Sequence, residues 1–110
     1  MRMKLENGCS VVGKLTTVGR RTGLLRAVEL RLLYYEGCFY ATSSRVDGKH
    51  WCQNMINEPK IEIGINGERL ACTAKRVTDE KLRRHILELR DTPPNLKRVV
   101  FEIKPRNAGV

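Results

Sequence analysis

The stretch from Leu15 to Arg26 gathers side chains and backbone groups that bind anions. Its donors are the guanidinium groups of Arg20, Arg21 and Arg26, the hydroxyls of Thr16, Thr17 and Thr22, and the backbone N–H groups of Gly19 and Gly23. Arginine matches phosphate with two parallel hydrogen bonds, and glycine lets the main chain approach a ligand closely. The stretch therefore suits a phosphate site, although a basic turn between two strands is more often a solvated surface feature.

A second stretch, from Ala41 to Pro59, places hydroxyl and basic groups around one aromatic side chain. Hydroxyls end an expected strand at Thr42, Ser43 and Ser44, and an expected helix begins with Lys49, His50 and Trp51. Hydroxyls at a strand end and N–H donors at a helix start suit an anionic ligand that carries a ring. Trp51 is either an aromatic wall for that ring or a core residue, and the sequence leaves both open.

The elements that must position these groups are mostly strands, because apolar and polar residues alternate along much of the chain. The expected strands cover residues 11–17, 28–34, 38–43, 60–65, 68–77 and 98–104. Glu36-Gly37 and Asn66-Gly67 are expected to form tight hairpin turns, and Asn-Gly is the strongest such signal in the sequence.

Two helices are expected to interrupt the strands. Asp47 is expected to cap a short helix that carries Trp51 and ends before Pro59. Thr78 is expected to cap a longer helix that ends at about Arg90. The apolar stripe of that longer helix is predicted to consist of Leu82, Ile86 and Leu89.

The resulting order is β-β-β-α-β-β-α-β in a chain of 110 residues. Six strands in so short a chain must close, or nearly close, to hide their edges. We therefore expect a mainly β protein, a six-stranded antiparallel barrel with two helices, as a single domain over residues 1–110. A content of 41% apolar and 30% charged residues is typical of a folded chain rather than a disordered one.

The formal net charge of +9 predicts a surface that attracts anions. Nucleic acid, a membrane surface and a phosphorylated small molecule are all compatible with that charge. Charge alone does not choose among these three partners.

The spacing of cysteine and histidine argues against a metal site. The cysteines stand at Cys9, Cys38, Cys52 and Cys72 and form no C-x-x-C pair, and the two histidines form no local pair. We therefore expect no bound metal, and free thiols in a reducing cytosol. No stretch resembles a secretory signal or a membrane span, which favours a cytoplasmic protein without a membrane partner.

The two stretches together resemble the deazaflavin-dependent nitroreductase family. The resemblance rests on Thr17–Gly23 followed by Arg26, then Thr42-Ser43, then Trp51-x-x-Asn54-Met55 with Asn57-Glu58-Pro59. The family pattern has a hydroxyl-x-Gly-Arg-Lys-Ser-Gly-x-x-Arg turn and a later Trp-x-x-Asn-Leu-x-x-Asn-Pro helix end. The family belongs to the pyridoxamine 5′-phosphate oxidase-like split barrels, which bind FMN or 8-hydroxy-5-deazaflavin, so the resemblance implies that the barrel is split.

The resemblance implies roles for individual residues. Arg20, Arg21, Thr22 and Gly23 match the turn that grips the cofactor phosphate, and Arg26 reaches it from the next strand. Ser43 and Ser44 match the strand end beside the ring, and Trp51 and Asn54 match the helix that closes the pocket. The sequence departs from the family where Arg21 replaces a lysine, and where Ser43–Gly48 replaces a longer loop that often contains Ser-Lys-Gly-Gly and prolines.

The function that the resemblance implies is that of an oxidoreductase. A reduced deazaflavin of the coenzyme F-420 type, or alternatively FMN, would reduce a small electrophile such as a nitro compound or a quinone, and the cofactor supplies the hydride chemistry. No separate catalytic residue is required. His50 and Tyr34 are candidate proton donors, although neither has a visible partner in the sequence. Family members often dimerise, so a symmetric homodimer is expected.

Two other functions remain compatible with the residues. A basic barrel can bind single-stranded nucleic acid, but such modules use exposed stacking aromatics, and this chain has only two Phe, three Tyr and one Trp. The second alternative is a protein that carries or senses the cofactor without turnover. We expect a nucleic-acid partner to be absent.

Overall fold

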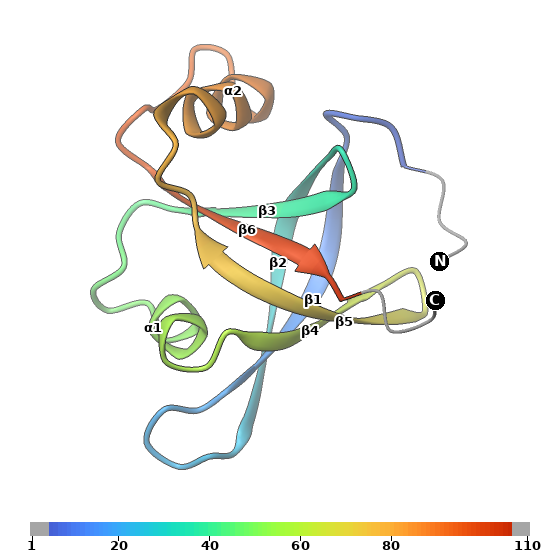
Figure 1. Cartoon of the computed structure of the whole chain (residues 1–110), viewed down its shortest axis with the longest axis vertical. Helices are drawn as coiled ribbons and strands as arrows, with labels where there is room; N and C mark the ends of the chain where they lie inside the picture. The colour runs from blue at the N-terminus through green and yellow to red at the C-terminus, as the bar shows by residue number, and fades with distance from the viewer. Residues whose placement is uncertain (1–4, 107–110) are drawn as a thin grey trace.

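The strands form a closed antiparallel barrel in the order β1-β2-β3-β6-β5-β4, in which β4 pairs back onto β1 (Figure 1). The computed structural model describes residues 5–106. The strands are β1 (Ser10–Val18), β2 (Leu25–Tyr35), β3 (Cys38–Ser43), β4 (Lys60–Ile65), β5 (Glu68–Arg76) and β6 (Val99–Pro105), and the helices are α1 (His50–Asn57) and α2 (Glu80–Arg90). The predicted fold class and element order are confirmed.

The two predicted hairpin turns join β2 to β3 and β4 to β5. Glu36 and Gly37 have φ values of 47° and 82°, and Asn66 and Gly67 have φ values of 51° and 80°. Two consecutive positive φ values twist a two-residue turn in the sense that matches the twist of the flanking strands. The residue types that predicted these turns therefore also determine their geometry.

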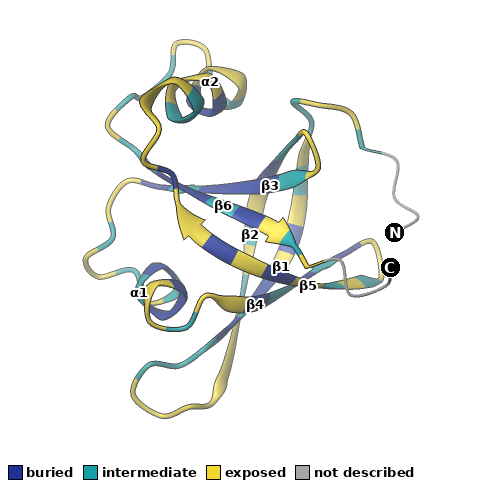
Figure 2. Ribbon diagram, in the orientation of Figure 1, coloured by how far each residue is buried: buried dark blue, intermediate teal, exposed yellow. Residues whose placement is uncertain are grey.

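The core lies inside the barrel and is built from the inward-facing positions of the strands (Figure 2). Its largest fully buried members are Leu15, Leu32, Phe39, Met55, Ile63, Ile65, Phe101 and Ile103. A second apolar cluster lies between α2 and the outer face of the barrel, where Leu33, Tyr40 and Val100 pack with Ile86 and Leu87. The two helices therefore have different partners, since Cys52 and Met55 of α1 join the inner cluster.

The predicted N-caps of both helices are wrong. The N-cap of α1 is Lys49, without a side-chain cap, rather than Asp47. The N-cap of α2 is Asp79, whose carboxylate accepts from the backbone N–H of Lys81, rather than Thr78. A carboxylate also gains from the positive end of the helix dipole, which explains why the aspartate takes this position.

The apolar stripe of α2 is also rotated from the predicted one. Ile86 and Leu87 are buried, Leu82 is half-buried and Leu89 is 38% exposed. The outer cluster meets the helix on the side that Ile86 and Leu87 share. The packing of α2 on the barrel decides this orientation, and helical periodicity alone does not fix it.

The barrel is closed by a short pairing between β2 and β3. β1 pairs with β2 from Leu25 to Leu33, whereas β3 pairs only with Leu33–Tyr35. Among the described residues, the first part of β2 thus has no strand on its β3 side. We call this the open side of the barrel, and it leaves one edge of β2 available to line a cavity. No described helix is long and apolar enough to cross a membrane.

We expect the free energy of unfolding to fall at alkaline pH because of the buried thiols. Burial raises the pKa of the Cys72 thiol to about 12. Between pH 9 and about 12 the unfolded chain loses this proton while the folded chain keeps it, so stability falls over that range and does not depend on this thiol below it. Urea unfolding of the wild type and of Cys72→Ala across pH 8–11 measures the effect. The free energy of unfolding of the variant should decrease less steeply with pH than that of the wild type. Equal slopes would contradict a raised pKa of the Cys72 thiol in the folded protein.

Candidate functional site

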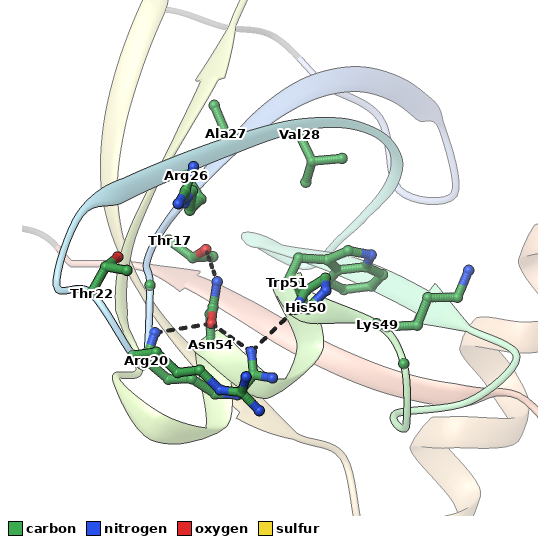
Figure 3. A pocket seen from close by; sticks show the side chains of 13 residues that line it. Thr17, Arg20, Thr22, Arg26, Ala27, Val28, Lys49, His50, Trp51 and Asn54 are labelled. Carbon is green, nitrogen blue, oxygen red and sulfur yellow. Dashed lines mark hydrogen bonds between the residues drawn. The ribbon is translucent and has the colours of Figure 1, made fainter.

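A cavity of about 630 Å³ lies between the β1–β2 turn and the start of α1, beside the open edge of β2 (Figure 3). It is lined by Thr17, Gly19, Arg20, Arg21, Thr22, Arg26, Ala27, Val28, Gly48, Lys49, His50, Trp51 and Asn54. Cofactor and small-molecule sites usually measure about 300–1,000 Å³, so the cavity has the size of a cofactor site.

The cavity brings the two stretches singled out in the sequence to one place. The predicted site residues that line it are Arg20, Arg21, Thr22, Arg26, Trp51 and Asn54. The turn contributes Arg20, Arg21 and Thr22, β2 contributes Arg26, and α1 contributes Trp51 and Asn54. Their proximity depends on barrel closure, because more than twenty residues separate Arg26 from Trp51. The roles of these six residues in cofactor binding stay predictions.

Three predicted site residues lie outside the lining. Gly23 has a φ of +72° and donates its N–H to the carbonyl of Gly19 at 2.8 Å, so it shapes the turn. The Ser43 hydroxyl is buried and donates to the carbonyl of Arg45 at 2.6 Å, which holds the following loop in place. Ser44 is exposed. The cavity gives no geometric support to a ring contact by the hydroxyl of Ser43 or Ser44.

The cavity also contains residues to which the family resemblance assigned no cofactor contact. Thr17, Lys49 and His50 are among the polar groups that the two sequence stretches singled out, and the structure places all three in the lining. Thr17 is buried. Nothing in the sequence marked the apolar residues Ala27 and Val28 as part of a site. They line the cavity because β3 does not pair with this part of β2.

Backbone hydrogen bonds close the β1–β2 turn into a compact loop. The N–H of Gly19 donates to the carbonyl of Leu24 at 2.7 Å, and the hydroxyl of Thr22 accepts from the N–H of Leu24 at 3.1 Å. A Cβ added at Gly19 would lie 2.9 Å from the Thr22 hydroxyl oxygen and 3.0 Å from the Leu24 carbonyl oxygen. A side chain at this position would therefore force the turn to shift, which glycine avoids.

Asn54 connects the turn to α1. Its side-chain amide is 3% exposed and donates from Nδ2 to the hydroxyl of Thr17 at 3.2 Å. Its Oδ1 accepts both the backbone N–H of Arg20, at 3.2 Å, and the Nη1 of the Arg20 guanidinium, at 3.3 Å. Figure 3 shows these contacts converging on one amide.

His50 makes a second contact with Arg20. Nη1 of Arg20 lies 3.3 Å from Nδ1 of His50. A guanidinium only donates hydrogen bonds, so Nδ1 must accept and the imidazole proton resides on Nε2. Both side chains come from the cavity wall, so this contact fixes the position of one guanidinium at the edge of the cavity.

The cavity wall is strongly positive. It contains Arg20, Arg21, Arg26 and Lys49, and no Asp or Glu is among the lining residues. α1 begins in this wall without a side-chain cap and without an acidic residue in its first turn, so its N-terminal N–H groups add positive potential. The chemistry that suits this wall is the binding of phosphate or another anion.

The cavity lining also contains apolar and aromatic residues, Trp51 on α1 and Ala27 and Val28 on β2. The indole of Trp51 also packs edge-on against Phe101, with ring centroids 6.2 Å apart. Trp51 thus lines the cavity and also packs against the core, and its contact with a cofactor ring stays a prediction. An aromatic wall beside a basic turn can hold a planar ring that carries a phosphate.

The two candidate proton donors have different positions. Tyr34 packs edge-on against Phe39, with ring centroids 5.3 Å apart, and is not part of the cavity lining. His50 lines the cavity. The geometry therefore favours His50 over Tyr34 for any contact with a ligand.

The sequence profile of the F420H(2)-dependent quinone reductase family matches residues 4–101. The chain belongs to this family. The predicted resemblance to deazaflavin-dependent reductases is thereby confirmed, as are the prediction of an oxidoreductase and the choice of a deazaflavin as cofactor. A search of curated proteins found no match.

Solved structures with the same fold include several split barrels. A putative pyridoxamine 5′-phosphate oxidase from Listeria innocua is 18% identical, with a TM-score of 0.73, and the match covers 87% of this chain and 84% of that one. An F420-H2 dependent reductase, FDR-A, is 23% identical, with a TM-score of 0.67, and the match covers 84% of this chain and 93% of that one. A putative 5-nitroimidazole antibiotic resistance protein from Bacteroides thetaiotaomicron is 10% identical, with a TM-score of 0.68. The match covers 91% of this chain and 75% of that one. At these identities the structures show the shared fold.

The turn gives a direct test of the site geometry. Gly19→Ala should lower the free energy of unfolding by about 1–3 kcal/mol, the usual effect of overpacking, because the backbone carbonyl of Leu24 must move. Urea unfolding measures this change. Gly64→Ala is the matched control, since its nearest new contact is an ordinary 3.8 Å from the carbonyl of Glu68. A Gly19→Ala protein as stable as the control would contradict the turn described above.

Proposed function

We propose that the cavity binds the reduced deazaflavin and that the protein reduces a quinone there. The observation that carries this proposal is a cofactor-sized cavity that combines four basic side chains, no carboxylate and an aromatic wall in a chain of this family. The bound deazaflavin supplies the hydride, and the protein supplies position, electrostatics and exclusion of water.

The phosphate of the cofactor is assigned to the turn. Within residues 5–106, no hydrogen bond or ion pair engages the side chains of Arg21 and Arg26, so their guanidinium groups are available to a ligand. A hydrogen bond to a charged group contributes about 1.5–3 kcal/mol. Two or three such bonds supply much of the roughly 8 kcal/mol that a micromolar Kd requires.

The ring of the cofactor is assigned to the space between Trp51 on α1 and Ala27 and Val28 on β2. These apolar surfaces exclude water from the ring, while the positive turn faces the anionic part of the molecule. Reduction of a quinone to a quinol takes up one hydride and one proton. His50 presents Nε2–H at the cavity wall, and we assign that group to a hydrogen bond with the ligand.

FMN is the alternative cofactor, because the basic turn suits the phosphate of either molecule. The family match favours the deazaflavin. A nitro compound is the alternative substrate, and one structure of the same fold is described as a putative 5-nitroimidazole antibiotic resistance protein. Turnover assays with a quinone and with a nitroimidazole, each with the reduced deazaflavin, distinguish these substrates.

Fluorescence of the single tryptophan provides a measurement of cofactor binding. Trp51 lines the cavity, so saturable binding of the deazaflavin should quench its emission. Arg21→Ala should raise the Kd about 10- to 100-fold, because it removes a hydrogen-bonding partner of the phosphate. Arg69→Ala is the control, since Arg69 is exposed on β5 and pairs with Glu62 at 3.1 Å, and its Kd should equal that of the wild type.

This titration, the turnover assays and retention on an oligonucleotide together distinguish the candidate functions. Equal binding by Arg21→Ala and the wild type would refute the phosphate assignment. Saturable binding without reduction of any quinone or nitro compound would indicate a cofactor carrier. Retention on a single-stranded oligonucleotide that weakens steeply with salt, without deazaflavin binding, would indicate the nucleic-acid alternative.

We further propose that the protein is a homodimer in the cytoplasm. Leu24 and Leu25 at the end of the β1–β2 hairpin are 60% and 72% exposed, and a second subunit would cover them. A structure of 25% identity and TM-score 0.68 is described as a domain-swapped dimer. The four cysteines are free thiols, which suits a reducing compartment. Light scattering coupled to size exclusion tests the dimer, and a monomeric mass at working concentration would contradict it.

A further inference from the structure

We propose that Asn54 does not bind the cofactor itself but positions Arg20 for the phosphate. This inference rests on the proposed function, and it changes the role that the sequence motif implied for Asn54. The motif placed Asn54 at the cofactor, whereas the structure shows what its amide contacts.

The hydrogen bonds of the Asn54 amide are directed into the protein. Oδ1 accepts two hydrogen bonds from Arg20, one from the backbone and one from Nη1, and Nδ2 donates to Thr17. A carbonyl oxygen has two lone pairs, so the acceptor capacity of Oδ1 is filled. Asn54 as a whole is also only 3% exposed. A ligand in the cavity would have to break these contacts to bind the Asn54 oxygen.

The same contacts leave part of Arg20 available. Asn54 and His50 both use Nη1 of Arg20. A guanidinium carries five N–H donors in a fixed planar fork, so the donors on Nε and Nη2 remain for a ligand. Arg20 is one of the residues that line the cavity. Asn54 and His50 therefore hold one edge of the guanidinium and leave the other edge for the phosphate.

The contact also holds the backbone of the turn. The N–H of Arg20 is fixed to α1, and the next residue along the chain is Arg21. The turn joins two strands at the open side of the barrel, so nothing in the β1–β2 pairing alone fixes its distance from α1. Asn54 supplies that constraint. A group held in place before binding loses less conformational entropy when the ligand arrives.

The test compares the coenzyme with a ligand that lacks its phosphate and the tail attached to it. We would measure the Kd of the 8-hydroxy-5-deazaflavin coenzyme, and of the ribityl deazaflavin without phosphate and tail (called the riboside below), by quenching of Trp51. Asn54→Ala should weaken binding of the coenzyme by about tenfold or more, the scale of loss for a misplaced binding group, and leave the Kd of the riboside nearly unchanged. Gln53→Ala is the control, since this neighbouring amide donates to the carbonyl of Val46 and is not in the cavity lining.

Each other result has a definite meaning. Equal weakening of both ligands would show that Asn54 contacts the ring, and unchanged affinities would show that it only stabilises the fold. Either result overturns the positioning role while the proposed function stands. A wild-type protein that binds the two ligands equally would overturn the phosphate site and the positioning role together.

Two further variants complete the test. In an Arg20→Ala background, Asn54→Ala should cause a much smaller further loss of coenzyme affinity than in the wild type, because the guanidinium it positions is gone. Additive losses would contradict the proposal. If Asn54→Ala does not fold, Thr17→Val removes one of the three Asn54 contacts and should show the same phosphate-selective loss at reduced size; equal effects on both ligands would overturn the proposal.

Discussion

The hydrogen bonds of one buried amide connect the two halves of the site. Asn54 on α1 forms hydrogen bonds with Thr17 in β1 and with Arg20 in the β1–β2 turn. Thr17 is also buried, so the contact lies away from competing water. Buried polar groups that have all their partners hold neighbouring elements in one arrangement. The geometry of the cavity depends on this contact.

The strand pairing of the barrel explains why the β1–β2 turn needs a contact with α1 to hold its position. β2 pairs along its length with β1 but meets β3 only at its last residues, which leaves an open side. A fully paired barrel would bury that edge and would have no place for a large ligand. The open side is lined instead by α1 and the loop before it, so the cavity has a strand on one side and a helix on the other. The fold thus provides a cofactor-sized space beside the part of β2 that has no β3 partner among the described residues.

The charge of the protein is organised at the same place. The excess of basic residues gave no preference among nucleic acid, membrane and phosphorylated ligands. The cavity concentrates arginine and lysine without carboxylates, and it adds the uncapped start of α1. Arg83 shows the contrast, since on the other helix it forms a bidentate pair with Glu80 and donates to two backbone carbonyls. Arg83 is thus bound to protein partners, whereas no hydrogen bond or ion pair within the described residues engages the side chains of Arg21 and Arg26 at the cavity.

The sequence by itself determined the strands, the turns and the basic residues of the site. Period-two alternation, Asn66-Gly67 and the need to hide strand edges depend on local chemistry and chain length, which the sequence contains in full. Only the tertiary structure decided that Ser43 holds a loop, that Asn54 faces Arg20, and that Ala27 and Val28 line a cavity. These facts depend on how far β2 pairs with β3 and on where α1 packs. The extent of β2–β3 pairing and the position of α1 are both set by contacts between residues far apart in the chain, and a local sequence pattern does not predict such contacts.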